Sequence, residues 1–397
     1  MSTLKVDGIR SNSASSDAIT LASDGTCTAN ITNNLSNRNL VINGAMQVAQ
    51  RGTSSTTSGY GDVDRWQHEY AGTDEAPTFA QVEVVSSDSG DNPFAKGFSN
   101  CARITNGNQT SGLQAASQIN FMQPIEAQNI RNSGWNYNSS SSYITLSYYV
   151  KASVAQEYHG FVKTADGSNY VYPFSLGSLS ANTWTKITKT IPGNSNLQID
   201  NNNGAGFQVW PVALYGTDYT DSGVNNDAWA AWASSSRNKD NTSTWWTTND
   251  ATFEITGVQL EVGSVATDFE HRTFAQELEL CKRYFFQIGR DARNNHTQRL
   301  AFPFINEAPS NTGGYINFRF YPEMRAAPTA TIGSELELGK PQVDMGSYHV
   351  SSFNNMTPCG CYFFQWSGGQ TGSTGDSNMY LRVGNVENSY AYFSAEL

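Results

Sequence analysis

Two stretches of the sequence decide the fold class, Tyr143-Ile-Thr-Leu-Ser-Tyr-Tyr-Val150 and Phe253-Glu-Ile-Thr-Gly-Val-Gln-Leu260. Both are rich in β-branched and aromatic residues and are strongly β-like, as expected of strands with one buried face. Similar runs recur between clusters of Asn, Gly and Ser. Alternating helices, which a parallel sheet would need, are absent from the pattern. The sequence therefore predicts an all-β protein with antiparallel sandwiches.

The same pattern divides the chain into zones. Residues 39–272 carry eight of the nine tryptophans, and we expect strands there at 40–50, 64–70, 79–85, 102–105, 143–151, 157–163, 170–174, 183–190, 207–215 and 252–262. Residues 291–397 return to strands, expected at 300–305, 315–321, 329–332, 349–353, 360–366, 379–383 and 391–395. We expect a central β-sandwich over 39–272 and a C-terminal β-sandwich over 291–397, with the last strand part of the fold.

One helical pattern separates these two zones. Thr273 is followed three residues later by Gln276, which is the spacing of a capping box. The apolar residues at helical spacing are Phe274, Leu278, Cys281 and Phe285. The pattern predicts a helix over 273–288, within a connecting segment 273–290.

The first 38 residues form a zone without Trp, Phe or Tyr. Residues 18–23 and 26–31 flank Asp24-Gly25, a strong hairpin signal. A two-stranded hairpin alone is marginal in water, and this zone has only one narrow apolar face. We therefore expect residues 1–38 to form an oligomerising β segment.

Composition excludes several classes of protein. Aromatic residues make up 12% of the chain and charged residues 15%, the opposite of a disordered chain. With 24 Lys and Arg against 35 Asp and Glu, the net charge is −11, which argues against a nucleic-acid partner. The longest apolar run, 228–233, is far shorter than the ~20 residues that cross a bilayer. We expect no membrane insertion and, since no basic-then-apolar stretch lies at residues 1–30, no secretory signal peptide.

The cysteines do not form a disulfide pattern, because they are scattered and odd in number: Cys27, Cys101, Cys281, Cys359 and Cys361. Cys359 and Cys361 lie at a spacing that a metal clip could use, but the nearest histidines, His349 and His296, are isolated. We expect reduced thiols, synthesis in a reducing cytosol and no cofactor.

The common catalytic and phosphate-binding motifs are absent from the sequence. Asp62-Val63-Asp64, next to Arg65-Trp66, is the most suggestive acidic pair, since two such carboxylates bind Ca²⁺ or, with a third acid, hydrolyse a glycoside. The favoured interpretation is a solvated turn before a strand anchored by Trp66. Three further residues carry a similar ambiguity: Glu254, Glu261 and His271.

The segment 224–249 carries a more informative signal. Four tryptophans lie there among Asn, Ser, Thr and Asp: Trp229, Trp232, Trp245 and Trp246. Indoles complement the apolar faces of sugar rings and short amides complement their hydroxyls, so these four are candidate carbohydrate-binding residues. The alternative is that they fill the sandwich core. A polar insertion of this length is long for a purely structural loop.

Several segments, in order along the chain, resemble virion adhesins of tailed bacteriophages, especially tail fibre proteins of marine and cyanobacterial phages. Those similar to the carbohydrate-binding-module-like jelly roll of that family are Asn39-Leu-Val-Ile-Asn-Gly-Ala-Met46, Gln50-Arg-Gly52, Asp64-Arg-Trp66, residues 143–153, Ile255-Thr-Gly-Val-Gln-Leu-Glu-Val-Gly263 and Ala266-Thr-Asp-Phe-Glu-His-Arg272. Those similar to its following helix, C-terminal module and N-terminal segment are Glu277-x-x-x-Cys281-x-Arg283-Tyr284-Phe285, Met324-Arg-Ala-Ala-Pro-Thr329, Ser394-Ala-Glu-Leu397 and Leu4-Lys-Val-Asp-Gly-Ile9.

This resemblance implies a homotrimeric tail appendage of a virion, made in the host cytoplasm. Its N-terminal segment would attach to other virion tail proteins, and its β modules, including a central jelly roll, would face host surface polysaccharide. The resemblance implies no catalytic set. Modules of this type often hold a structural Ca²⁺, but its ligands find no match here.

Three functions remain as hypotheses. The leading one is a non-enzymatic tail fibre that adsorbs the particle to surface glycans, with avidity from several weak sites. The second is a polysaccharide depolymerase tailspike, for which Asp62, Asp64, Glu254 and Glu261 are the nominees. The third is a purely structural tail or capsid component.

Overall fold

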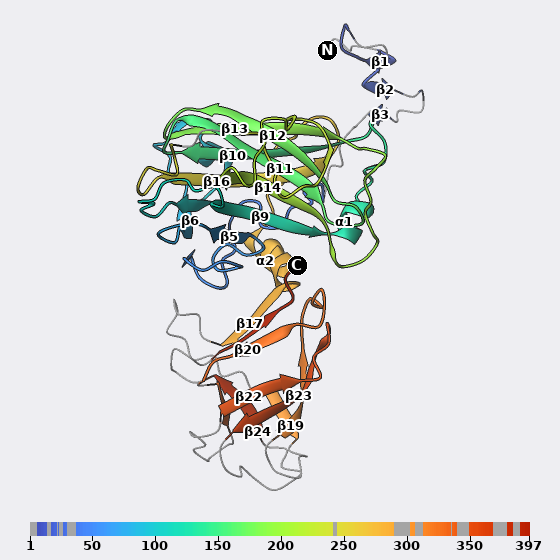
Figure 1. Ribbon diagram of the computed structural model, residues 1–397. Coiled ribbons are helices and arrows are strands. Elements are labelled where there is room, and N and C mark those ends of the chain that lie inside the picture. Colours follow the sequence, from blue (N-terminus) through green and yellow to red (C-terminus); the bar gives the residue numbers. More distant parts are fainter. Residues whose placement is uncertain are drawn as a thin grey trace.

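The computed structural model describes residues 6–13, 17–21, 23, 27–29, 37–240, 244–289, 302–305, 313–334, 336–339, 349–367, 379–383 and 390–397. Almost all regular structure in these ranges is β, which confirms the expected fold class. The described helices are α1 (Ala127–Arg131), α2 (Phe274–Lys282) and the 3-10 helix η1 (Pro93–Lys96). A large sandwich lies between a small N-terminal sheet and a C-terminal barrel (Figure 1).

The central body is a sandwich of two sheets. One has the order β4 (Ser54–Ser55), β6 (Thr78–Glu83), β8 (Asn100–Thr105), β16 (Thr252–Val262), β10 (Tyr143–Ala152), β13 (Thr183–Pro192), β7 (Ser89–Gly90). The other has the order β15 (Ala230–Ala231), β12 (Tyr170–Leu179), β11 (Gln156–Thr164), β14 (Ala205–Tyr215), β9 (Gln118–Glu126), β5 (Gln67–Ala71). The pairing of β13 with β7 is parallel, and the other pairings of the two sheets are antiparallel.

The two stretches that predicted the fold pair with each other at the centre of the seven-stranded sheet. In β10 the inward side chains are Ile144, Leu146, Tyr148 and Val150, all fully buried. Strand β16 contains a bulge at Gly257, where the pairing with β10 shifts register. The bulge changes which residues face inward, so that Phe253 and Ile255 before it and Val258 and Leu260 after it all reach the core.

The expectation of a strand at 40–50 is wrong, because the segment folds around one asparagine. Asn43 has a φ of 58°, and its side chain accepts a hydrogen bond from Val48 N at 3.0 Å and donates to the carbonyls of Val48 and Asp64 at 2.9 Å each. An asparagine side chain that satisfies backbone groups in this way favours a turn over a ladder.

Strand β9 was not expected from the sequence. Pro124 lies inside it, and proline cannot donate to a ladder. The structure accommodates it because the pairing of β9 with β5 ends at Met122, so no ladder to β5 remains at Pro124. On that side the Pro124 carbonyl accepts a hydrogen bond from Arg65 at 2.8 Å.

Helix α2 begins as predicted and ends earlier. Thr273 and Gln276 form the expected capping box. Cys281 is buried, but Phe274 is 56% exposed and Glu277 is buried in its place. The helix ends at Lys282 rather than near 288, because β17 (Phe285–Gly289) pairs with the last strand of the chain.

The C-terminal part is a small sheet and a barrel rather than the expected second sandwich. The sheet has the order β17, β25 (Tyr390–Ser394), β20 (Thr329–Ile332), so the last strand is part of the fold. The barrel has the order β18 (Phe302–Ile305), β19 (Gly313–Arg319), β23 (Gly360–Ser367), β22 (His349–Asn354), β21 (Leu336–Gly339), β24 (Met379–Val383). Because β18 pairs with both β19 and β24, the sheet closes on itself. Alternation along short strands does not distinguish a closed from an open sheet.

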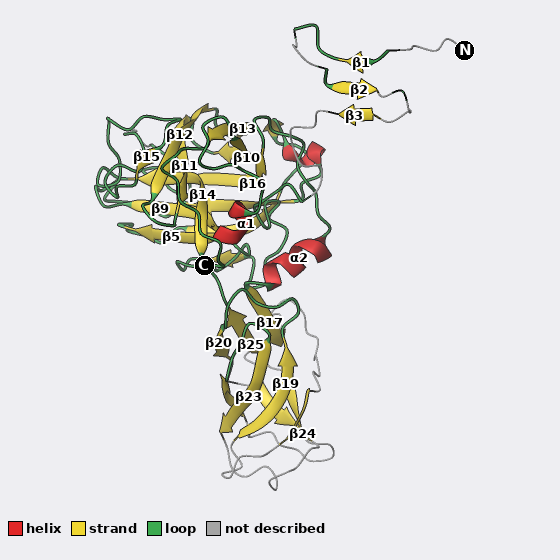
Figure 2. Cartoon of the chain, turned by 90° about the vertical axis from the view of Figure 1, so that its right-hand side faces the viewer, coloured by secondary structure: helices red, strands yellow, loops and turns green. Residues whose placement is uncertain are grey.

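The N-terminal zone forms a three-stranded sheet of β1 (Gly8–Ile9), β2 (Ile19–Leu21) and β3 (Cys27–Ala29). Strands β2 and β3 pair as the hairpin pattern predicts, with Ile19 opposite Ala29 and Leu21 opposite Cys27. The expected turn at Asp24-Gly25 lies outside the described residues. Figure 2 shows this sheet extending away from the sandwich. The trimer stays a prediction.

The sandwich and the C-terminal sheet meet at buried charges. Arg65 and Arg51, from the sandwich, both pair with Glu396, the latter at 3.0 Å. Arg283, which follows α2, pairs with Glu126 of the sandwich at 2.8 Å. In the described ranges no helix is long and apolar enough to cross a membrane.

Candidate functional site

The polar connection from β14 to β16 folds back over the edge of the six-stranded sheet. Strand β15 pairs with β12 inside this connection, placing Tyr170 opposite Ala231. Asp227 N donates to Pro173 O at 2.8 Å, and Trp232 N donates to Asn169 O at 2.9 Å. These contacts fix the loop against β12, so its side chains have defined positions.

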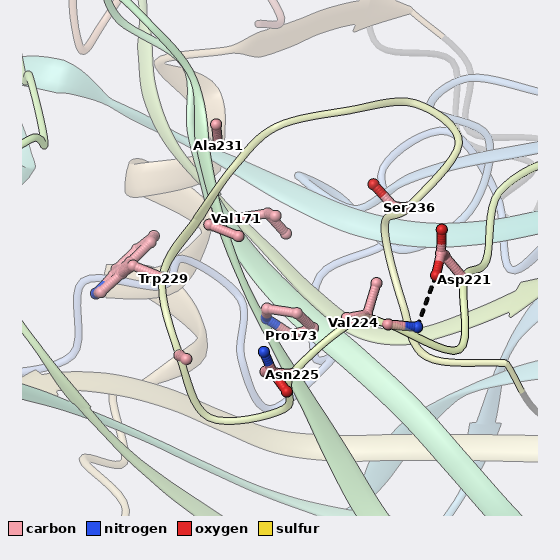
Figure 3. A pocket seen from close by; sticks show the side chains of 11 residues that line it. Val171, Pro173, Asp221, Val224, Asn225, Trp229, Ala231 and Ser236 are labelled. Carbon is pink, nitrogen blue, oxygen red and sulfur yellow. Dashed lines mark hydrogen bonds between the residues drawn. The ribbon is translucent and has the colours of Figure 1, made fainter.

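A pocket with a volume of about 330 Å³ lies between this loop and the outer face of β12. We call it the Trp229 pocket. Its lining residues are Val171, Pro173, Asp221, Gly223, Val224, Asn225, Ala228, Trp229, Ala230, Ala231 and Ser236. Trp229 lies at one end and Asp221 and Ser236 at the other (Figure 3). The volume is at the lower end of the ~300–1,000 Å³ usual for small-molecule sites.

Trp229 is half-buried and held by two contacts. Its indole Nε1 donates to Pro192 O at 2.7 Å, and its ring packs edge-to-face on Tyr172 at 5.3 Å between centroids. These contacts satisfy the polar edge of the indole, and the residue still lines the pocket. Trp229 therefore forms one end of the pocket lining in a fixed orientation, with its Nε1 on the side away from Asp221 and Ser236 (Figure 3).

The polar end of the pocket carries Asp221, Asn225 and Ser236. Asp221 Oδ1 accepts a hydrogen bond from Gly223 N at 2.6 Å, which orients the carboxylate (Figure 3). Carboxylate, amide and hydroxyl groups together accept and donate hydrogen bonds. The arrangement suits a ligand with one apolar face and several hydroxyls.

Trp232 is also half-buried, but it lies outside this pocket. Lys163 Nζ lies 4.4 Å from its ring centroid and Arg237 Cζ lies 5.4 Å away. Phe161 packs against it at 5.8 Å. These cation–π and ring contacts engage the indole within the protein, so Trp232 covers the sheet.

Trp245 and Trp246 do not take part in a surface site, which corrects the candidate set. They are 0% and 1% exposed and belong to the main core. Trp245 Nε1 donates to Thr252 O at 3.0 Å, and Asn106 Nδ2 donates to Trp246 O at 2.7 Å. Of the four tryptophans predicted from the sequence, one lines the pocket.

The carboxylates nominated for hydrolysis do not line the Trp229 pocket. Asp62 is buried with Oδ1 3.4 Å from His68 Nδ1. Glu254 pairs with Arg103 at 2.6 Å and with Lys151 at 2.7 Å.

The two other nominees are also buried. Glu261 accepts hydrogen bonds from Thr267 N at 2.8 Å and from Thr267 Oγ1 at 2.7 Å. Asp64 accepts a hydrogen bond from Gln50 N at 2.9 Å, and burial raises the pKa of its carboxyl to about 6. These contacts give Asp64, Glu254 and Glu261 structural partners in the sandwich. Asp62 is buried beside His68, but its carboxylate oxygens accept no hydrogen bond from the described residues.

The described residues bear on two expectations, metal ligands and the state of the cysteines named above. Within the described ranges no three His, Cys, Asp or Glu side chains gather as metal ligands, so no residues are assigned to a Ca²⁺. Cys101, Cys281 and Cys361 are buried thiols, and Cys361 Sγ donates to Asn354 O at 3.3 Å, whereas Cys359 is an exposed thiol. His296 lies outside the described residues.

The sequence reasoning missed the part of the pocket contributed by β12. Val171 and Pro173 face outward there, whereas Tyr172 and Phe174 between and beyond them point into the core. Their role depends on the pairing of β12 with β15, a contact that no local pattern signals.

No family model and no curated protein matches the chain. Similar solved structures include the enzymatically active domain of tailspike protein 4 of bacteriophage CBA120, at 13% identity and a TM-score of 0.31 over 56% of this chain and 21% of that chain. They also include the family 11 carbohydrate-binding module of a Clostridium thermocellum cellulase, at 12% identity and a TM-score of 0.25 over 54% of this chain and 96% of that chain. A third is the N-terminal cellulose-binding domain of Cellulomonas fimi β-1,4-glucanase C, at 11% identity and a TM-score of 0.27 over 55% of this chain and 99% of that chain. Likeness of this degree assigns no function to the chain.

Proposed function

We propose that the chain is a non-catalytic carbohydrate-binding protein and that the Trp229 pocket is its glycan site. One observation carries the proposal: a tryptophan of fixed orientation lies in the same pocket as a carboxylate, an amide and a hydroxyl. A sugar ring would place its C–H face on Trp229 and its hydroxyls against Asp221, Asn225 and Ser236. Because the loop is already pinned to β12, binding would cost little ordering entropy.

We further propose that the protein is a virion tail appendage that adsorbs a phage to host surface polysaccharide. Support comes from the ordered series of segments that resemble tail fibre proteins and from an N-terminal sheet that extends away from the sandwich. In a homotrimer three Trp229 pockets would act together. Simultaneous contact raises avidity by ~10²–10⁴ where the geometry allows it.

Affinity electrophoresis tests the glycan site directly. The full chain is run through native gels that contain a β-1,3-1,4-glucan, a mannan, a xylan or bacterial lipopolysaccharide. We expect retardation in at least one gel, and we expect Trp229→Ala to weaken that interaction about tenfold or more, a loss of ~1.4 kcal/mol.

Trp232→Ala is the matched control, because Trp232 is equally half-buried on the same loop but lies outside the pocket. It should be retarded like the wild type. Equal loss in both variants, or no retardation of the wild type in any gel, would contradict the proposal.

A further inference from the structure

A second pocket, with a volume of about 220 Å³, lies on the outer face of the seven-stranded sheet. Its lining residues are Lys96, Phe98, Ser147, Tyr149, Lys186, Gly257, Thr267, Asp268, Phe269 and His271. We call it the Tyr149 pocket. Tyr149 alternates with the core residues Tyr148 and Val150, so its ring faces away from the core and away from the sheet that carries the Trp229 pocket.

The bulge at Gly257 makes room for this pocket. Gly257 has a φ of 65°. A Cβ atom there would lie 2.8 Å from Phe98 Cζ and 3.0 Å from Tyr149 Cδ2. Only a residue without a side chain permits both rings to approach the backbone, so glycine shapes the floor.

Aromatic rings form one wall. Phe98 packs against Phe269 at 4.8 Å, against His271 at 4.9 Å and against Tyr149 at 5.7 Å between centroids. His271 Nε2 contacts Lys96 O at 2.9 Å, which fixes the imidazole. The rings of this wall therefore support one another through contacts within the protein.

Polar groups line the remainder. Asp268 and Lys186 are both exposed. The Asp268 backbone carbonyl accepts from Arg38 at 2.7 Å, which holds that residue in place, and Lys186 Nζ lies 5.8 Å from the Tyr149 ring centroid. Ser147 adds a hydroxyl. Lys96 and Thr267 also line the pocket. Carboxylate, ammonium and hydroxyl groups together match the mixed donors and acceptors of a neutral sugar.

We propose that the Tyr149 pocket binds one neutral hexose unit through its aromatic wall and the polar groups of Asp268 and Lys186. Its volume lies below the ~300–1,000 Å³ of drug-sized sites, which favours a terminal or branch sugar over an extended chain. The inference rests on the proposed function and extends it. Each chain would carry two sugar sites on opposite outer faces of the sandwich, so that one protomer could bridge two glycan branches.

Saturation-transfer NMR on the full chain tests the second site, with the methyl pyranosides of glucose, galactose and mannose as probes. The background is Trp229→Ala, so that binding at the first site does not contribute. We expect at least one probe to bind. We expect Asp268→Asn and Lys186→Met each to weaken that binding about tenfold, because each removes a hydrogen-bonding charge.

Asp250→Asn and Lys239→Met are the matched controls, since both residues are exposed and neither lines the Tyr149 pocket. In the Trp229→Ala background, these two variants should bind the methyl pyranosides as tightly as the Trp229→Ala protein itself. Absence of binding by every probe, or equal affinity in the pocket and control variants, would overturn this inference. The proposed function fails separately, when the wild type binds no polysaccharide in the gels.

Discussion

Arg65 is a single residue on which the junction between the sandwich and the C-terminal sheet depends. It is 1% exposed, pairs with Glu396 and donates to Pro124 O at 2.8 Å. Its guanidinium lies 3.5 Å from the ring centroid of Tyr284. A buried charge that loses its partner is strongly destabilising.

We expect Arg65→Met to lower the free energy of unfolding by about 3 kcal/mol, because Glu396 would keep only Arg51 as a partner. Adding Glu396→Met to this variant should recover part of the loss, since the buried Glu396 carboxylate is then removed and Arg51 keeps Asp64 as a partner at 3.9 Å. Chemical denaturation measures both. Lys282→Ala, which removes an exposed pair with Glu279, is the control and should change stability by less than about 1 kcal/mol. If Arg65→Met also changed stability by less than about 1 kcal/mol, the junction would not depend on Arg65.

Asp64 makes the same region sensitive to pH. Burial raises the pKa of its carboxyl to about 6, and nearby Arg51 opposes this effect. Because the folded-state pKa lies above the unfolded one, the folded protein binds the proton more tightly. Stability from this group is therefore full at pH values below about 4 and is lost as the pH rises through 6.

Asp64→Asn should consequently stabilise the protein at pH 7.5 by on the order of 2–3 kcal/mol relative to wild type, and by much less at pH 4.5. Denaturation midpoints of both proteins at the two pH values provide the comparison. A difference between the proteins that does not change with pH would show that Asp64 stays ionised in the folded state.

At the scale of elements, local pattern predicted the strands in which side-chain period and pairing agree. Strand β10 is an example, since its inward residues Ile144, Leu146, Tyr148 and Val150 alternate and all belong to the core. Pattern failed where a side chain competes with the ladder, as Asn43 does in the segment 40–50. It failed again where a proline is tolerated beyond the end of a pairing, as Pro124 is in β9, whose pairing with β5 ends at Met122. The alternation of apolar and polar residues signals neither the turn at Asn43 nor the strand that contains Pro124.

The bulge in β16 gives an element-scale prediction. Gly257→Ala should lower stability by roughly 1–3 kcal/mol, because the backbone is left-handed and the new Cβ meets the rings of Phe98 and Tyr149. Gly177→Ala is a matched control, with a φ of 79° and nothing within 4 Å of its Cβ position. The unfolding temperatures of the two variants separate the effect of ring contact from that of backbone strain. Equal losses of stability in both would show that the rings of Phe98 and Tyr149 adjust freely to the new Cβ.

At the scale of the whole molecule, the N-terminal sheet is the least self-sufficient part. Val6, Ile9 and Leu21 are 38%, 53% and 39% exposed in the single chain. Three short strands with exposed apolar side chains gain little stability on their own, and association between copies would bury them.

We expect the full chain to sediment as a trimer and a chain lacking residues 1–36 to sediment as a monomer with an unchanged unfolding temperature. The truncation keeps Arg38, which bonds Asp268 O. Analytical ultracentrifugation and calorimetry measure the two properties. If the truncated chain remained trimeric, the contacts that form the trimer would lie outside residues 1–36. If the full chain were monomeric, the predicted trimer would be refuted.

The candidate site was predictable only in part. Composition singled out the polar loop and its four tryptophans, but an irregular loop has no period from which to tell an inward indole from an outward one. Trp245 and Trp246 lie near the start of β16 and enter the core, whereas Trp229 stays at the surface beside β12. The pocket exists because β15 pairs with β12, which brings residues about sixty positions apart in sequence together.

The most direct test of the glycan site is a fluorine NMR titration of the full chain labelled with 5-fluorotryptophan. The probe is the polysaccharide that retards the wild type most, cut to oligosaccharides, and each resonance is assigned by Trp→Phe substitution. We predict that the Trp229 resonance shifts on titration while those of Trp245 and Trp246 stay in place. A stationary Trp229 resonance at saturation of the protein would contradict the account.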